Sequence, residues 1–194
     1  MPNINTHGVF VTLGASNHSD VEREEYDYYA TDPHAVECLL DRVTFNHRIW
    51  ECACGEGHIS RVLESRGYDV TSTDLIDRGF GQGGVDFFTQ TDVFPGDIIT
   101  NPPYKYAQKF VTHALELVPT GHKVAMLLRI QFLEGLSRRA LFDQSPPREV
   151  MVFSRRVSCA LNGDFDSYGA GAQAHAWFIW EKGYKGAPII TWTN

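Results

Sequence analysis

Short apolar runs alternate with segments of helical periodicity along most of this chain, and this alternation limits its fold more than any other feature. Strands are predicted at 48–53, 69–73, 97–100, 123–130, 149–154 and 174–180, and helices from 33 onward and at 59–66, 105–117 and 133–142. The run from 123 to 130 is apolar almost throughout, which is typical of a central strand buried on both faces. Strands that alternate with helices predict an α/β fold: an open, mostly parallel sheet with helices on both faces.

A chain of 194 residues suits one domain with one core. Residues 1–25 show no clear period and predict a loose N-terminal arm, which leaves 26–194 as a single domain. No apolar run approaches the roughly 20 residues of a membrane helix, and no secretory signal is evident. The four cysteines form no metal-ligand pattern. These features together predict a cytoplasmic protein with no metal and no membrane contact.

Charge is distributed unevenly along the chain. The net charge of −7 argues weakly against a nucleic-acid partner, but residues 1–100 carry 17 acidic and 6 basic side chains, whereas residues 101–194 carry 7 and 11. The second half could therefore present a phosphate-facing surface, although chance would explain the asymmetry equally well. The candidate phosphate contacts are Lys105, Lys109, Arg138, Arg139, Arg155 and Arg156.

Three polar or glycine-rich motifs follow predicted strands, and in open α/β sheets such positions meet at one crevice. The first is Glu51-Cys-Ala-Cys-Gly55-Glu-Gly57, a strand that enters a glycine turn before a helix. Glycines allow backbone to approach a ligand closely, but residue 60 is Ser where a full G-x-G-x-x-G has its third glycine. The second is Asp74, about twenty residues later, where a carboxylate can accept hydrogen bonds from ribose hydroxyls. The two motifs together predict binding of a nucleoside-type cofactor.

The third motif, Asn101-Pro102-Pro103-Tyr104, follows the strand predicted at 97–100. Its two prolines remove two backbone donors and stiffen the loop, so that carbonyl groups and the Asn amide oxygen remain as acceptors. Acceptors of this kind orient the two N–H bonds of an amino-group substrate, and Tyr104 offers a flat face for a planar base. The motif therefore predicts transfer to an amino nitrogen and distinguishes a methyltransferase from an oxidoreductase.

The order of these segments resembles that of adenine-N6 DNA methyltransferases, a family of class I S-adenosylmethionine-dependent enzymes, and in particular its bacteriophage-like members. Tyr29-Ala-Thr31-Asp32-Pro33 is similar to the family's leading motif, Asp86-Phe87 to its adenine-binding segment and His175 to Trp180 to a late strand. The resemblance implies a Rossmann-like methyltransferase fold of about seven strands, one late strand being antiparallel. It implies Asn101, Pro102, Pro103 and Tyr104 as catalytic residues, and cofactor contacts from Tyr29, Thr31, Glu51, Ala53, Gly55, Gly57, Asp74, Leu75, Asp86 and Phe87.

The resulting hypothesis is transfer of a methyl group from S-adenosylmethionine to the N6 amino group of adenine in nucleic acid, with DNA preferred to RNA. The base would have to leave the helix to reach the site, and Phe165 and Tyr168 of the loop at 157–173 are candidates to hold it. The family usually carries a target-recognition domain after the catalytic region, whereas this chain ends soon after its last predicted strand, so a separate specificity subunit is an open alternative. RNA adenine, a protein glutamine amide, and a non-catalytic cofactor-binding subunit are the competing interpretations. The oligomeric state is left open.

Overall fold

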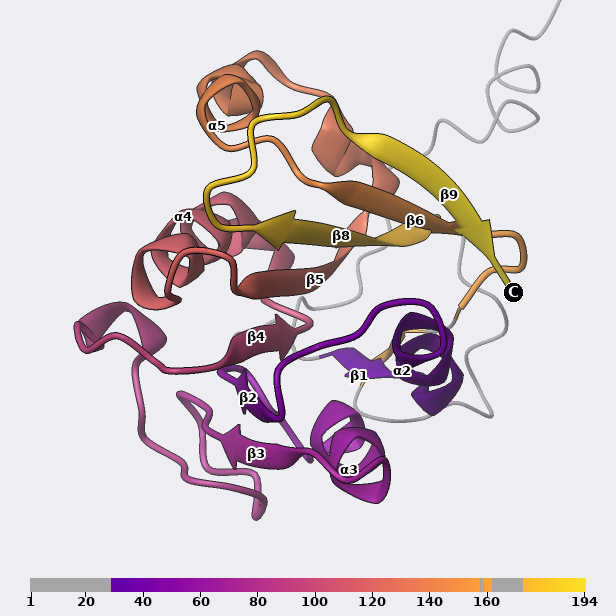
Figure 1. The fold of residues 1–194 in the computed structure, drawn as a ribbon. Helices are drawn as coiled ribbons and strands as arrows, with labels where there is room; N and C mark the ends of the chain where they lie inside the picture. The colour runs from indigo at the N-terminus through magenta and orange to yellow at the C-terminus, as the bar shows by residue number, and fades with distance from the viewer. Residues whose placement is uncertain (1–28, 158, 162–172) are drawn as a thin grey trace, which may run out of the picture.

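The computed structural model describes residues 29–157, 159–161 and 173–194 of the chain (Figure 1). The predicted arm at residues 1–25 lies outside the described residues, and so do Phe165 and Tyr168 of the predicted base-holding loop. That residues 26–194 form a single domain stays a prediction.

Seven strands form one open sheet in the order β3-β2-β4-β5-β8-β6-β9 (Figure 1). They are β2 (Arg48–Glu51), β3 (Asp69–Ser72), β4 (Asp97–Thr100), β5 (Lys123–Arg129), β6 (Glu149–Phe153), β8 (His175–Glu181) and β9 (Ile189–Thr193). Strands β3, β2, β4 and β5 are parallel, whereas β8 is antiparallel to both of its neighbours, β5 and β6. The predicted α/β fold, an open and mostly parallel sheet with an antiparallel late strand, is confirmed.

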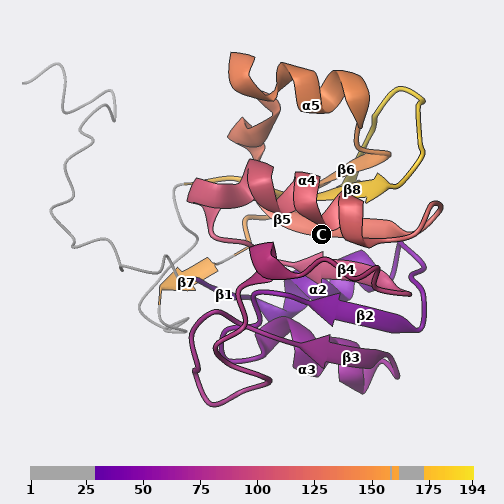
Figure 2. The ribbon, with the colours of Figure 1, turned by 90° about the vertical axis from the view of Figure 1, so that its left-hand side faces the viewer.

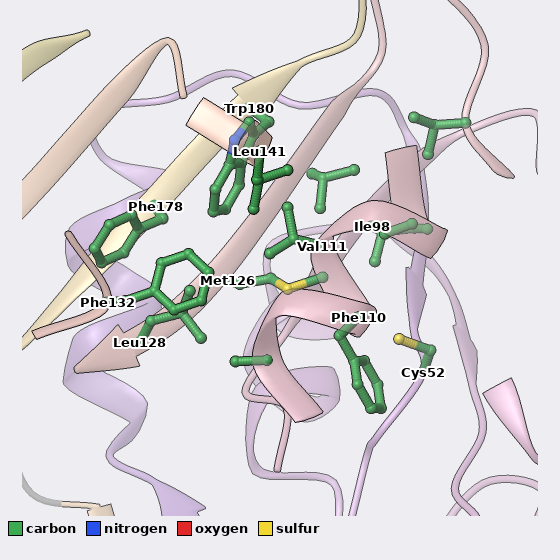
Figure 3. Close-up of a cluster of buried hydrophobic side chains, with 14 of the residues drawn as sticks. Cys52, Ile98, Phe110, Val111, Met126, Leu128, Phe132, Leu141, Phe178 and Trp180 are labelled. Carbon is green, nitrogen blue, oxygen red and sulfur yellow. The ribbon is translucent and has the colours of Figure 1, made fainter. Parts of the chain in front are cut away.

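Successive residues of β2, β4, β5, β6 and β8 point into two different cores, one on either face of the sheet. On β5, Met126 and Leu128 pack in the core that contains α4 (Ala107–Leu117) and α5 (Arg139–Gln144), part of which is shown in Figure 3. The intervening residue, Leu127, packs in the core that contains α2 (Pro33–Leu40) and α3 (His58–Ser65). Helices therefore cover both faces, and β5 is buried on both sides, as its apolar sequence predicts.

The helix predicted to open at Asp32-Pro33 does so. The Asp32 carboxylate accepts a hydrogen bond from the His34 backbone N–H at 2.9 Å, and Pro33 is the first helical residue. The Trp177 indole on β8 donates to the Ala35 carbonyl at 2.8 Å, which ties this helix to the centre of the sheet. In the described part of the chain, no helix has both the length and the apolarity to cross a membrane.

The structure differs from the predicted elements in four places. The helix predicted at 133–142 is instead two short 3₁₀ turns, Ile130–Leu133 and Leu136–Arg138, followed by α5, because Gly135 at φ 127° interrupts the helical path. The helix predicted at 105–117 begins with a 3₁₀ turn at Tyr104–Tyr106 and is α-helical only from Ala107. Strand β9, and the two-stranded antiparallel sheet of β1 (Tyr29–Thr31) with β7 (Cys159–Leu161), were not predicted (Figure 2).

Candidate cofactor and substrate site

A cavity of about 560 Å³ lies at the carboxyl ends of β2, β3 and β4, where an open α/β sheet binds its ligands. Ten of the residues that the sequence predicted for the site line this cavity: Tyr29, Thr31, Glu51, Ala53, Asp74, Leu75, Asp86, Phe87, Asn101 and Pro103. Gly55, Gly57, Pro102 and Tyr104 are close in sequence to lining residues but are not themselves part of the lining. The size of the cavity is in the range of small-molecule and cofactor sites.

The loop between β2 and α3 takes its shape from two glycines in left-handed conformations. Gly55 has φ 53° and Gly57 has φ 83°, values that other residues adopt only with strain. A Cβ atom on Gly57 would lie 2.5 Å from the Phe80 ring, so this position has no room for a side chain. Backbone bonds hold the turn in place: the Cys54 N–H donates to the Thr73 carbonyl at 3.0 Å.

Asp74 ties the glycine loop to the end of β3. One of its carboxylate oxygens accepts from the Gly55 N–H at 2.8 Å and the other from the Ile76 N–H at 2.8 Å. A carboxylate oxygen has two lone pairs, so each can accept one further hydrogen bond from a ligand in the cavity. Asp86 is held similarly, with one oxygen accepting from the Phe88 N–H at 2.9 Å. Both acids therefore present fixed acceptors that suit hydroxyl and amino groups of a nucleoside.

Glu51 is a buried carboxyl at the cavity wall, with 1% of its surface exposed. Its partner is the Ser60 hydroxyl, which donates to it and lies 2.7 Å from the hydroxyl of Ser72. Burial raises the pKa of the Glu51 carboxyl well above its ordinary value, an effect that the hydrogen bond from Ser60 only partly offsets. A cationic ligand group in the cavity would favour the charged form. Ser60, which replaces the third glycine of the nucleotide-binding pattern, thus has a role that the sequence reasoning missed.

Asn101 is oriented by the leading strand. Its side-chain N–H₂ group donates to the Tyr29 carbonyl at 3.2 Å and to the Thr31 hydroxyl at 3.0 Å. Because a carbonyl can only accept, these bonds fix which amide atom is nitrogen. The amide oxygen, Oδ1, is buried and has no hydrogen-bond partner among the described residues. Asn101 therefore offers an unused acceptor at the cavity wall.

The Tyr104 ring lies among polar and aromatic neighbours beside the cavity. It stacks with Tyr29 at 6.0 Å and with His175 at 5.6 Å between ring centroids, and the Arg129 guanidinium carbon lies 4.6 Å from the ring centre. The predicted role of Tyr104 as a platform for a planar base stays a prediction. A base that uses this ring would also meet Arg129 and His175, neither of which the sequence predicted for the site.

The candidate phosphate contacts fall into different settings. Lys105 and Lys109 line the cavity, whereas the Arg138 side chain folds back to donate to carbonyls of its own loop, including that of Phe132 at 2.8 Å. Arg139 pairs with Asp143 one helical turn away. Arg155 and Arg156 are exposed beyond the end of β6. Only the two lysines are therefore brought to the cavity itself.

An open seven-stranded sheet, with one strand antiparallel between β5 and β6 and a cavity at the carboxyl ends of β2, β3 and β4, is a Rossmann-like methyltransferase fold. The chain has this fold. It matches no protein-family model and no curated protein at the level of sequence.

Solved structures share the fold at low sequence identity. A Vibrio vulnificus protein named as a modification subunit of a type I restriction enzyme aligns with 84% of this chain and 46% of its own, at 12% identity and a TM-score of 0.56. A Listeria monocytogenes protein named as a class I S-adenosylmethionine-dependent methyltransferase aligns with 82% and 62%, at 14% identity and 0.54. A predicted O-methyltransferase from Agrobacterium tumefaciens aligns with 83% and 84%, at 14% identity and 0.56. The chain thus spans less than two thirds of the first two proteins.

Proposed function

We propose that this protein is an S-adenosylmethionine-dependent methyltransferase that acts on the N6 amino group of adenine in nucleic acid, with DNA preferred to RNA. The observation that carries the proposal is the state of the Asn101 amide. Its N–H₂ group is engaged by Tyr29 and Thr31, and its oxygen remains a buried acceptor without a partner among the described residues. A buried acceptor left unpaired costs stability, and an incoming N–H donor removes that cost.

The residues around the cavity fit the chemical groups of the cofactor. Asp74 is suited to the ribose hydroxyls, Asp86 and Phe87 to the adenine ring, and Glu51 to the positively charged methionine part. When bound, the cofactor supplies a methyl group made electrophilic by its sulfonium. The protein contributes by orientation: Asn101 Oδ1 and the Pro102 carbonyl accept the two amino hydrogens, which directs the nitrogen lone pair toward the methyl group. The nitrogen–carbon bond would form as the methyl–sulfur bond breaks, S-adenosylhomocysteine would leave, and the methylated nitrogen would then lose one N–H proton to solvent, so no residue has to form a covalent bond with the substrate.

Adenine fits this site better than a protein amide for one specific reason. Tyr104, the last residue of the loop at 101–104, stacks with Tyr29 and His175, and such a group of planar rings suits a planar heterocycle. The restriction-modification name of the Vibrio vulnificus protein with the same fold favours DNA. RNA adenine and protein glutamine are the alternatives within the same chemistry. If the isolated chain methylates adenine with low sequence specificity, we propose that a separate partner subunit recognises the target sequence.

The test is labelled methyl transfer from S-adenosylmethionine to unmethylated DNA, RNA of the same sequence and a glutamine-bearing protein, followed by nucleoside mass spectrometry. We expect N6-methyladenine, with DNA as the better substrate. Asn101→Ala should lower the rate by at least about 100-fold, as loss of one positioned polar group does in other enzymes, while cofactor binding by calorimetry changes little. Asn46→Ala is the matched control, because Asn46 lies before β2 at the opposite edge of the sheet.

Each alternative has its own result in this experiment. Label in glutamine or in RNA alone would replace the DNA assignment, and cofactor binding without transfer to any acceptor would indicate a non-catalytic subunit. Full activity in Asn101→Ala would contradict the assignment of the acceptor. Binding of NAD in preference to S-adenosylmethionine would reject the class of reaction.

A further inference from the structure

The buried side-chain atoms that lack a hydrogen-bond partner in the described part of the chain lie together, where β4 and β5 end and β8 begins. Besides Asn101 Oδ1 and Thr100 Oγ1, the buried side-chain atoms without a hydrogen-bond partner in the described residues are Arg129 Nε and both ring nitrogens of His175. Buried polar atoms are normally paired, and each exception asks for an explanation. Thr100 lies beside the thiol of Cys52, a weak partner, but among the described residues no such neighbour accounts for the unpaired atoms of Arg129 and His175.

Arg129 and His175 form a pair next to the loop of residues 101–104. They are directly opposite each other where β5 ends and β8 begins, so their side chains leave the same face of the sheet. The adjacent strand on the other side of β5 is β4, which ends at Thr100, the residue before Asn101. The Tyr104 ring contacts both members of the pair. His175 is 9% exposed, so its two nitrogens are shielded from solvent.

We propose that Arg129 and His175 read the acceptor nitrogens of the target base whose amino group is held by Asn101. This inference rests on the proposed function. In adenine, an acceptor ring nitrogen lies on each side of the amino group, N1 on one side and N7 on the other. A base whose amino group donates to Asn101 Oδ1 would then present N1 and N7 as acceptors to the donors of Arg129 on β5 and His175 on β8.

The chemistry of the pair favours a base edge over a phosphate. His175 has a pKa lowered to about 4, because burial and the neighbouring Arg129 charge disfavour the imidazolium. The ring is therefore neutral at pH 7, with one donor and one acceptor, which matches the mixed edge of a base. The unused nitrogen of Arg129 is the inner Nε, a directional donor beside a ring, in a position that suits in-plane contact with a heterocycle.

Two conservative variants distinguish hydrogen bonding to the target base from packing against the Tyr104 ring. His175→Phe keeps a flat ring beside Tyr104 but removes both nitrogens. Arg129→Lys keeps the positive charge near the ring but removes the planar Nε donor. The matched controls are His47→Phe and Arg148→Lys at the opposite edge of the sheet, where His47 is exposed and Arg148 pairs with Glu181. Because His175→Phe removes two unpaired buried atoms, we expect it to fold with an unchanged or higher Tm.

The measurement uses short single-stranded oligonucleotides that contain one adenine, one 1-deazaadenine or one 7-deazaadenine. Their affinities are measured by anisotropy with S-adenosylhomocysteine present, and kcat/KM is measured with S-adenosylmethionine. For the wild-type protein, removal of a nitrogen that is read should weaken binding by about 10- to 100-fold, the range for a hydrogen bond to a charged or buried group. In His175→Phe or Arg129→Lys, or in both, that penalty should fall to less than about twofold.

Three results would overturn the inference. If an active wild-type protein uses all three bases equally well, the inference that Arg129 and His175 read the base is rejected, whereas the proposed function still stands. If Arg129→Lys keeps wild-type activity, and if both variants still bind the deaza analogues as weakly as the wild type does, the pair would be assigned to contact with a phosphate. Absence of adenine methylation by a wild-type protein that binds the cofactor would reject both the inference and the proposed function.

Discussion

Gly57→Ala tests whether the glycine loop has the close-packed form described above. Gly57 precedes α3 with φ 83°, and a Cβ atom there would lie 2.5 to 2.6 Å from three carbons of the Phe80 ring. Gly67, just after the same helix, has a similar φ of 87°, but a Cβ atom there would have nothing within 4 Å. The two glycines therefore differ in available space and hardly at all in backbone conformation.

The magnitudes follow from this difference. A left-handed conformation costs a non-glycine residue about 1–2 kcal/mol, and this cost applies to Gly57→Ala and Gly67→Ala alike. Overpacking against the Phe80 ring adds about 1–3 kcal/mol in Gly57→Ala alone. We therefore expect losses of about 2–5 kcal/mol at Gly57 and about 1–2 kcal/mol at Gly67. Set against the typical stability of about 5–15 kcal/mol of a folded domain, both variants should fold.

The assay is urea unfolding of the two variants and the wild type, with the free energy of unfolding obtained from the midpoint and an unchanged m-value. Calorimetry with S-adenosylhomocysteine provides the second measurement, and it should show weakened binding only for Gly57→Ala. Equal destabilisation by the two variants, or normal ligand binding by Gly57→Ala, would refute the described loop geometry.

Three further predictions concern ionisable groups. Because the folded-state pKa of Glu51 is raised, the contribution of Glu51 to stability should fall as pH rises from the ordinary carboxyl pKa through the raised value. Glu51→Gln should then gain Tm relative to wild type at pH 8 but not at pH 4, and bind S-adenosylmethionine more weakly. Because the pKa of His175 is lowered to about 4, the contribution of His175 to stability should fall as pH drops from about 6.5 toward 4, by an amount on the order of 3 kcal/mol. The stability difference between His175→Phe and wild type in urea unfolding should therefore shift in favour of the variant between pH 8 and pH 5. Asp74→Ala should lower cofactor affinity by more than about tenfold in calorimetry, whereas Asp77→Ala, which removes the acceptor of the Gly79 N–H, should not.

The parts of the fold that could be predicted are those with a strong local signal. The apolar run of β5, the Asp32-Pro33 start of α2 and the strand before Asn101 each follow from residue types within one segment. The rule that ligands bind where parallel strands end then brings Asp74 and Asn101 to one cavity without further information.

The parts that could not be predicted depend on contacts between distant segments. Strand β1 has three residues, too few for a pattern, yet its Tyr29 carbonyl and Thr31 hydroxyl orient an amide 70 residues or more away in sequence. Ser60 has the appearance of a missing glycine in the sequence, and only the fold brings its hydroxyl to Glu51. The pairing of Arg129 with His175 depends on strand register across the sheet, which sequence alone does not define.

A crystal structure of the protein with S-adenosylmethionine or a methyl-bearing analogue would show whether the methyl group and the Asn101 acceptor face each other as proposed. We predict that the methyl group points at the loop of residues 101–104, leaving room for an amino nitrogen roughly 3–3.5 Å from the methyl carbon and within hydrogen-bond reach of Asn101 Oδ1. A bound cofactor whose methyl group points away from Asn101 would contradict this claim.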